Sequence, residues 1–132
     1  MTDDIGKLVL RVSVGVLILL HGIFKLQNGV DGIAGMLGGY GLPAFLAYGV
    51  YLGEVVGPVL VIIGVFTRIG ALLIAGNMLV AVGLAHMQEL FSLGQMGGWA
   101  LELQGMFLFG SIAIALLGAG RHSVGGIHGR FN

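Results

Sequence analysis

Hydrophobic residues gather in four long runs along the chain, and shorter polar or glycine-rich stretches separate them. The runs cover Ile5–Leu26, Ala44–Phe66, Ile69–Met87 and Trp99–Ala119. Each has about 20 residues, the length at which an α-helix crosses roughly 30 Å of hydrocarbon. The pattern therefore predicts an all-α integral membrane four-helix bundle that forms one domain over residues 1–132.

The stretches between the runs predict how the helices connect. Only Thr67 and Arg68 separate the second run from the third, which indicates a tight antiparallel hairpin. The longer connection from Gln27 to Pro43 is rich in glycine, and we expect its segment Val30–Leu37 to form a short amphipathic helix at the membrane interface. Pro43 is suited to begin the second helix, because the first helical N–H has no intrahelical acceptor.

Composition agrees with lipid as the solvent. Hydrophobic residues make up 57% of the 132 residues and charged residues 9%, whereas soluble domains have about 25% charged residues. The net charge is zero, so nothing predicts a nucleic-acid partner. The chain has no Cys, which excludes disulfides and thiolate chemistry on its own side chains. Its 26 glycines would let helix backbones approach closely.

The first run is expected to remain as a helix, because Arg11 interrupts it and no small-residue cleavage site follows. The positively charged residues predict its orientation. With both termini in the cytoplasm, that side holds Lys7, Arg68, Arg121 and Arg130, and only Lys25 lies outside. Cytoplasmic loops carry the excess of Lys and Arg, so the sequence favours an N-in, C-in topology.

Polar side chains within the runs need partners, because an ionisable group in hydrocarbon costs several kcal/mol. They are Arg11, His21, Lys25, Glu54, Asn77, Glu102 and Gln104. At about 100° per residue, Arg11, His21 and Lys25 share one side of the first helix with Gly15 and Gly22. Two interpretations stay open for the cations: Arg11 faces inward or snorkels to the headgroups, whereas for Lys25 snorkelling is favoured.

Glu54 lies near the middle of the second run, where it cannot snorkel. Gly49, Gly53 and Gly57 flank it at four-residue spacing and predict a closely packed face. Pro58 has no N–H to bond the carbonyl oxygen of Glu54. Glu54 is therefore either a structural group, protonated or ion-paired with Lys25, His21 or Arg11, or a working proton, cation or ligand site.

Four residues from separate helices are expected to face the outer half of the bundle: His21, Glu54, His86 and Glu102. Their residue types can ligate metals, and His21, His86 and Glu102 are weak candidates, but the spacing matches no metal motif and we predict no metal. Two His could also ligate a haem, which nothing else supports. Asn77 and Gln104 are expected to form interhelical hydrogen bonds, and Arg11, Asn77 and Arg68 to have structural roles.

The motifs resemble those of the DoxX family of small bacterial membrane proteins. They are Arg11 with His21-Gly22-Ile23-Phe24-Lys25-Leu26, then Gly41-Leu42-Pro43, Glu54, Gly64-Val65-Phe66-Thr67-Arg68, Glu102 and Gly118-Ala119-Gly120-Arg121-His122-Ser123. The resemblance implies a multi-pass protein of the bacterial inner membrane. It also implies a link to quinone-coupled thiosulfate, thiol or oxidative-stress chemistry, usually beside redox partner proteins.

Three functions follow as expectations. The first is a redox-associated membrane subunit that binds a quinone, with His21 or His86 donating to the headgroup and Glu54 or Glu102 handling a proton. The sequence contains no flavin, iron–sulfur or haem motif, so such a subunit needs a partner and is not a self-sufficient enzyme. The alternatives are a non-catalytic scaffold that recruits proteins, and a small proton- or cation-coupled carrier that works as a homo-oligomer.

Overall fold

The computed structural model describes residues 2–83, 91, 93, 97–98 and 100–132. Its elements within those residues are helical: α1 (Thr2–Asn28), α2 (Asp31–Gly39), the 3₁₀-helix η1 (Ala44–Gly49), the π-helix η2 (Leu52–Val56), α3 (Gly57–Ile63), α4 (Thr67–Ala81) and α5 (Glu102–Leu117). The predicted all-α class is confirmed. Trp99, the predicted start of the fourth run, and His86, a predicted site residue, lie outside the described residues.

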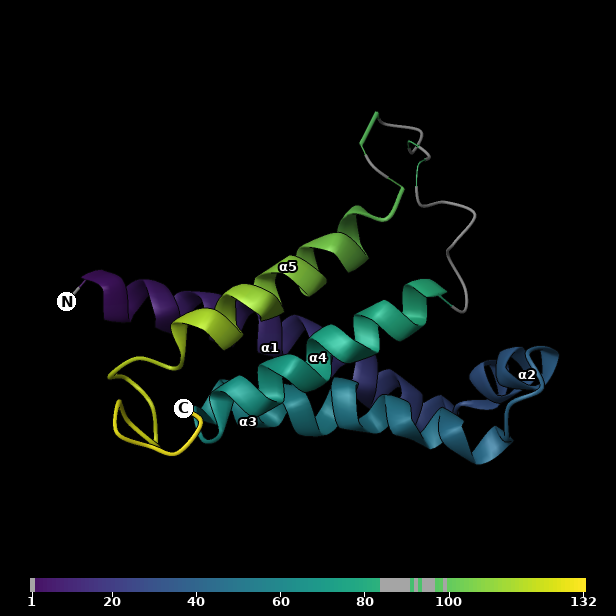
Figure 1. Ribbon diagram of the computed structural model, residues 1–132, viewed down its shortest axis with the longest axis horizontal. Helices are drawn as coiled ribbons and strands as arrows, with labels where there is room; N and C mark the ends of the chain where they lie inside the picture. Colours follow the sequence, from purple (N-terminus) through teal and green to yellow (C-terminus); the bar gives the residue numbers. More distant parts are fainter. Residues whose placement is uncertain (1, 84–90, 92, 94–96, 99) are drawn as a thin grey trace.

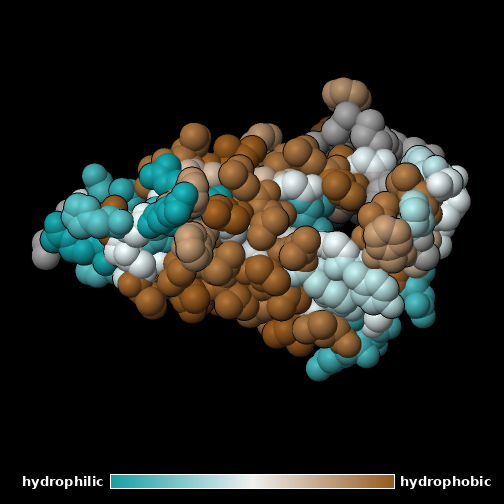
Figure 2. Space-filling view, turned by 60° about the horizontal axis from the view of Figure 1, so that its bottom comes forward, coloured by the Kyte–Doolittle hydropathy of each residue, from teal (hydrophilic) through white to brown (hydrophobic). Residues whose placement is uncertain are grey.

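The helices form an elongated bundle with two different ends (Figure 1). The N-terminus, the α3–α4 connection and the C-terminal segment after α5 lie at one end, hereafter the tail end. The short helix α2 lies at the opposite end, hereafter the α2 end. Figure 2 shows a hydrophobic band across the middle of one face, with hydrophilic residues toward the two ends. Such a band is the surface that a membrane-spanning bundle presents to lipid.

Two helical stretches are long and apolar enough to cross a membrane: Thr2–Asn28 with 27 residues and Phe45–Ile63 with 19. The helices α4 and α5 are apolar but shorter, with 15 and 16 residues. The third predicted run continues to Met87, and residues 84–90 lie outside the described part. The structure therefore supports a helical membrane protein with two helices of full spanning length. It does not show the other two runs as full spans over the described residues.

The second predicted helix is not uniform. It begins directly after Pro43 as a 3₁₀-helix, widens into the π-helix η2 around Glu54, and becomes regular only in α3. The missing N–H of Pro58 accounts for the irregular turn, because no regular i to i+4 bond can form from the carbonyl of Glu54. Single turns of π-helix are frequent at functional sites.

The predicted hairpin between the second and third runs is confirmed, but its turn lies earlier than Thr67 and Arg68. Helix α3 ends at Gly64, whose φ of 77° gives a left-handed cap, and Phe66 follows with a φ of 47°. Helix α4 then begins at Thr67. Glycine adopts this left-handed conformation without steric cost, so the chain reverses at Gly64 and leaves Thr67 and Arg68 helical.

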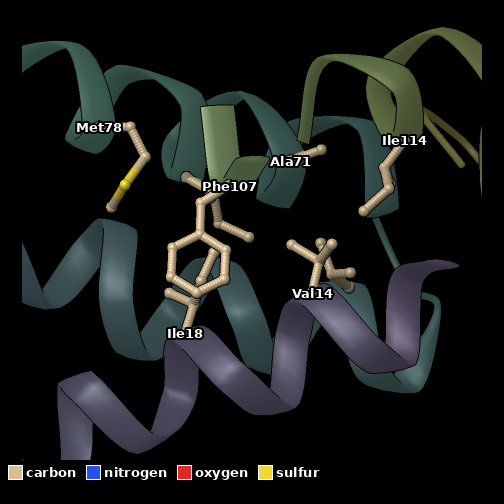
Figure 3. Packing of buried hydrophobic residues seen from close by; sticks show 8 residues of the cluster. Val14, Ile18, Ala71, Met78, Phe107 and Ile114 are labelled. Carbon is tan, nitrogen blue, oxygen red and sulfur yellow. The ribbon is translucent and has the colours of Figure 1, made fainter. Parts of the chain in front are cut away.

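The core lies between α1, α3, α4 and α5 and is apolar. Figure 3 shows Phe107 of α5 above Ile18 of α1, with Met78 of α4 beside them. Further along the same seam, Val14 and Ile114 meet near Ala71. These side chains are at most 8% exposed. In a bilayer such contacts stabilise through close packing, because lipid tails are as apolar as the helices.

A second, smaller cluster attaches α2 to η1. Val30, Leu37 and Ala47 are buried there, and Tyr51 packs against them. The short helix predicted over Val30–Leu37 is thus confirmed, with observed bounds Asp31–Gly39. It begins one residue after Val30 and covers the α2 end of the bundle beside η1.

Candidate ligand-binding site

An ion pair joins α1 to η2 inside the bundle. The ammonium nitrogen of Lys25 lies 2.6 Å from both carboxylate oxygens of Glu54. The side chain of Glu54 is 4% exposed, whereas that of Lys25 is 28% exposed. A buried carboxylate needs such a partner, because its desolvation is otherwise very costly. Of the alternatives for Glu54, the structure shows an ion pair, and the partner is Lys25.

Close backbone packing brings these two residues together. A side chain on Gly22 would collide with the backbone carbonyl of Glu54, so only glycine lets α1 approach η2 at this level. Lys25 follows Gly22 by nearly one helical turn and therefore reaches the carboxylate of Glu54. The hydroxyl of Tyr51 donates to the carbonyl oxygen of Lys25 at 3.1 Å and fixes this end of α1.

Asn77 of α4 completes the polar cluster. Its amide nitrogen donates to Oε2 of Glu54 at 3.3 Å, so Oε2 accepts from both Lys25 and Asn77. The side chain of Asn77 lies directly against Gly53, where any Cβ would overlap it. The expected interhelical hydrogen bond of Asn77 is present, and it connects Glu54 to α4.

The cluster lies at the wall of an apolar cavity of about 720 Å³. Lys25, Glu54 and Asn77 supply its charged and amide groups, and the other lining residues are apolar or glycine. They are Ile33, Met36, Leu37, Leu42, Leu46, Ala47, Gly49, Val50, Leu52, Gly53, Leu72, Leu73, Gly76, Val80 and Ala81. Ligand pockets usually have about 300–1,000 Å³, a mostly apolar lining and a few converging polar groups, and this cavity has all three features.

The glycines near Glu54 have two different uses. Gly53 and Gly57 pack against α4, as the four-residue spacing predicts: a Cβ on Gly57 would lie 2.9 Å from the carbonyl oxygen of Gly70. Gly49 instead has no atom within 4 Å of its Cβ position and lines the cavity. Gly76 of α4 does the same from the other wall. The missing side chains of Gly49 and Gly76 therefore leave room for a ligand.

The structure bears on the two cations of α1, Lys25 and Arg11, whose side chains were expected either to face inward or to snorkel. Lys25, for which the sequence favours snorkelling, instead pairs its ammonium group with the buried carboxylate of Glu54. Arg11 faces inward and is 1% exposed. It donates to the carbonyl oxygens of Ala119 at 3.2 Å, Val61 at 3.0 Å and Ile62 at 2.6 Å, and also to that of His122.

The predicted gathering of His21, Glu54, His86 and Glu102 is wrong for the members that the structure describes. His21 is exposed; its Nδ1 lies 2.9 Å from the carbonyl oxygen of Leu17, and its ring meets the edge of Phe107. It follows Leu17 by one turn and faces α5 rather than η2. Glu102 is exposed at the start of α5, and Gln104 is half-buried. Neither lines the cavity. His86 lies outside the described residues.

No three His, Asp or Glu side chains lie close enough to hold a metal ion within the part of the chain that the structure describes. The weak metal candidates were His21, His86 and Glu102, and His86 is not in that part. What the structure does bring together is a cation, a carboxylate and an amide. Such groups hydrogen-bond an oxygen-containing headgroup.

The tail end has a different polar network. The side-chain oxygen of Asn132 accepts from the backbone N–H of Thr67 at 3.1 Å and from its hydroxyl at 2.7 Å, which caps the start of α4. Arg68 donates to the carbonyl oxygens of Ala115 and Leu116 near the end of α5. The backbone N–H of Arg121 donates to Asp4 and lowers the pKa of that carboxyl from its usual 3.8.

Sequence reasoning missed Tyr51 and the role of Gly76. Tyr51 precedes Glu54 by three residues, so the two lie on one face of the second helix, and this spacing is the signal that indicates a shared site. Gly76 adjoins Asn77 in the sequence, but nothing in the sequence tells whether a glycine permits contact or leaves a space.

The family model named DoxX matches residues 6–87, and this range contains Gly22, Lys25, Glu54 and Asn77. The chain belongs to the DoxX family. It is also 36% identical, over 116 residues, to a protein of Bacillus subtilis (strain 168) named "Putative oxidoreductase CatD". That alignment covers 88% of this chain and 81% of the relative. No solved structure matches the chain. As a DoxX-family membrane protein, it carries the ion pair and all the named cavity-lining residues within the family's matched segment.

Proposed function

We propose that this DoxX-family protein is a membrane subunit of a redox system and binds a lipid-soluble quinone or quinol in the cavity. The observation that carries the proposal is the apolar cavity of about 720 Å³ with Lys25, Glu54 and Asn77 in its wall. An apolar ring and tail fit the aliphatic lining, and the oxygens of the headgroup need the hydrogen-bonding groups that this cluster offers.

The chemistry of the cluster supports a redox ligand. Lys25 and Asn77 carry N–H donors for a quinone oxygen. In this proposal they take the donor role that was expected of His21 or His86. Glu54 lies within hydrogen-bond distance of both and is a carboxylate in an apolar surrounding, a suitable proton acceptor when a quinol is oxidised. The electrons of that oxidation pass to a partner protein, since the sequence has no Cys and no recognisable flavin, iron–sulfur or haem motif.

The cellular setting belongs to the same proposal. We place the protein in the bacterial inner membrane with the tail end in the cytoplasm, where Lys7, Arg68, Arg121 and Arg130 form the positive side. The α2 end, with the cavity, then faces outward. A reporter active only outside the cytoplasm tests this: it should work when fused within Asn28–Gly39 and fail when fused after Asn132.

Binding in the cavity is tested with glycine variants of the purified full-length protein. Gly76→Leu places a side chain in the cavity where no atom lies within 4 Å, so packing is kept while the space is filled. Gly83→Leu is the matched control, since Gly83 also has free space and does not line the cavity. We expect decylubiquinone to bind wild type and Gly83→Leu equally, and Gly76→Leu at least tenfold more weakly.

Two results count against the proposed function. If the wild-type protein bound neither decylubiquinone nor its reduced form, the proposed function would be refuted. Equal binding by Gly76→Leu and Gly83→Leu would show that a quinone binds elsewhere. Mass spectrometry of lipids that co-purify with the protein from native membranes in mild detergent gives an independent check, with a bound quinone as the expected result.

A further inference from the structure

The hydrogen bonds within the cluster leave specific atoms unused, and these atoms define what a bound headgroup must offer. The ammonium group of Lys25 has three N–H donors, and the bonds to Oε1 and Oε2 of Glu54 use two of them. The third donor remains for a ligand. Lys25 lines the cavity and keeps 28% of its side chain exposed, so that donor is accessible from the cavity.

The amide of Asn77 has a fixed orientation. A carboxylate paired with Lys25 can only accept, so Asn77 must present its NH₂ group to Oε2 of Glu54. Its carbonyl oxygen Oδ1 therefore points away from Glu54. Gly53, which has no side chain, lies directly against Asn77 and leaves the amide little freedom to turn.

Oδ1 of Asn77 accepts no hydrogen bond from the described residues, and those residues include no fully enclosed side-chain oxygen or nitrogen without a partner. Asn77 is half-buried and lines the cavity. Among the described residues, the cavity wall thus presents two unused donors, one on Lys25 and the second N–H of Asn77, and one unused acceptor, Oδ1 of Asn77.

From this arrangement we infer that the site selects the reduced, hydroxyl-bearing form of its ligand, and that Asn77 determines this selectivity. The inference rests on the proposed function. A quinol hydroxyl can donate to Oδ1 of Asn77 while its oxygen accepts from Lys25. A quinone oxygen can accept from Lys25 or from the second N–H of Asn77, but it brings only lone pairs toward Oδ1, and an acceptor enclosed by the ligand without a donor weakens binding.

The charge of the cluster agrees with a neutral ligand of this kind. Lys25 and Glu54 neutralise one another, and Asn77 carries no charge. An anion such as thiosulfate would have to compete with Glu54 for the ammonium group, and a cation with Lys25 for the carboxylate. An uncharged phenolic head needs neither exchange.

The experiment compares the affinity of wild-type protein in detergent for decylubiquinol and decylubiquinone under anaerobic conditions. We expect the quinol to bind at least fivefold more tightly. Asn77→Leu should reduce this ratio to about one, mainly by weakening the quinol. Gln104→Leu is the control, because it removes another half-buried amide that does not line the cavity.

The outcomes separate this inference from the proposed function. If wild type binds neither form, the proposed function fails and the inference fails with it. If it binds both forms equally, or the quinone more tightly, the site still takes a quinone but does not select the reduced form. If Asn77→Leu keeps the fivefold ratio, Asn77 is not the determinant. The wild-type measurement decides the main point even if Asn77→Leu does not fold.

Discussion

At the tail end of the bundle, Arg11 donates to four backbone carbonyl oxygens and is 1% exposed, whereas at the α2 end Lys25 has a single carboxylate partner and stays 28% exposed beside a cavity. Both cations lie on α1 and both are enclosed by other helices. The difference lies in how many of their donors the protein itself uses.

The bonds of Arg11 connect the middle of α1 to the ends of two other segments. Val61 and Ile62 belong to the last turn of α3, and Ala119 and His122 follow α5. The last carbonyls of a helix have no intrahelical partners and carry its partial negative charge, so a cation there serves as a cap. With four of its five N–H donors bonded, Arg11 has a structural role.

Lys25 and Asn77 line the cavity and keep two donors and one acceptor that no described residue uses. A protein that needed only stability would gain from apolar residues there, because a buried ion pair rarely stabilises more than well-packed hydrophobic side chains. The comparison teaches that the number of unused hydrogen-bonding groups, more than burial or charge alone, distinguishes the structural cation Arg11 from Lys25, for which we propose a binding role.

Arg11→Met should have the largest effect on this comparison. It leaves four carbonyl oxygens without their donor, and we expect the free energy of unfolding to fall by roughly 3–5 kcal/mol. Thermal unfolding in detergent measures the loss. Arg68→Met is the matched control, since its bonds to carbonyl oxygens are exposed; it should lose less than about 1 kcal/mol. Equal losses for the two variants would refute the assignment of Arg11 as a buried cap.

Gly22→Ala tests the backbone contact that brings Lys25 to Glu54. The added Cβ collides with the carbonyl of Glu54, so the helices must separate, and we expect a loss of about 2 kcal/mol. Gly6→Ala on the same helix meets no atom within 4 Å and should be neutral or stabilising by up to about 1 kcal/mol. Both are read from chemical unfolding. A stable Gly22→Ala protein with unchanged ligand affinity would show that this approach is not required.

The energy of the ion pair itself is measured by a double-mutant cycle with Glu54→Gln and Lys25→Met. Lys25→Met leaves the carboxylate of Glu54 without its cation, and Glu54→Gln removes the charge while keeping an oxygen acceptor. The double variant should recover part of the two losses, with a coupling energy of about 1–2 kcal/mol. Additive losses would mean that the two side chains do not interact, contrary to the 2.6 Å contact.

The smallest effect is expected at the tail end, at Asp4. Because the pKa of Asp4 is lowered in the folded protein, the carboxylate stabilises the fold above pH 3.8, and this contribution is lost as the pH falls through the folded pKa below 3.8. Asp4→Asn should therefore lower the unfolding temperature slightly at pH 6 and by a smaller amount at pH 2.5. Asp3→Asn, the same change next to it, is the control. If the difference in unfolding temperature between wild type and Asp4→Asn grew as the pH fell, the stabilising role of the Asp4 carboxylate would be contradicted.

The sequence predicted the parts of the fold that depend on composition and periodicity. The apolar runs, the start of a helix after Pro43 and the short helix near Val30–Leu37 follow from local rules, and the structure contains them. Glu54 could be chosen as the residue that needs a partner, since a carboxylate in an apolar run always does. Family membership was likewise readable from motifs.

Which partner Glu54 has could not be predicted, because it depends on the rotation of whole helices. Lys25 and His21 are separated by four residues on α1, and their angular difference is small enough that either could face Glu54. The contact of Gly22 with the backbone of Glu54 decides in favour of Lys25 and leaves His21 beside Phe107. The irregular turns of η1 and η2 add a further rotation that no regular helical period describes.

The most direct test of the binding cavity uses the absence of Cys in the natural chain. Gly49→Cys places one thiol in the cavity wall, and Gly35→Cys places one on α2 at a position that does not line the cavity. We measure the rate at which a membrane-permeant maleimide labels each thiol, with and without saturating decylubiquinol. Bound quinol should slow the labelling of Gly49→Cys at least fivefold and leave Gly35→Cys unchanged; equal rates with and without quinol at Gly49→Cys, in protein shown to bind it, would contradict the account.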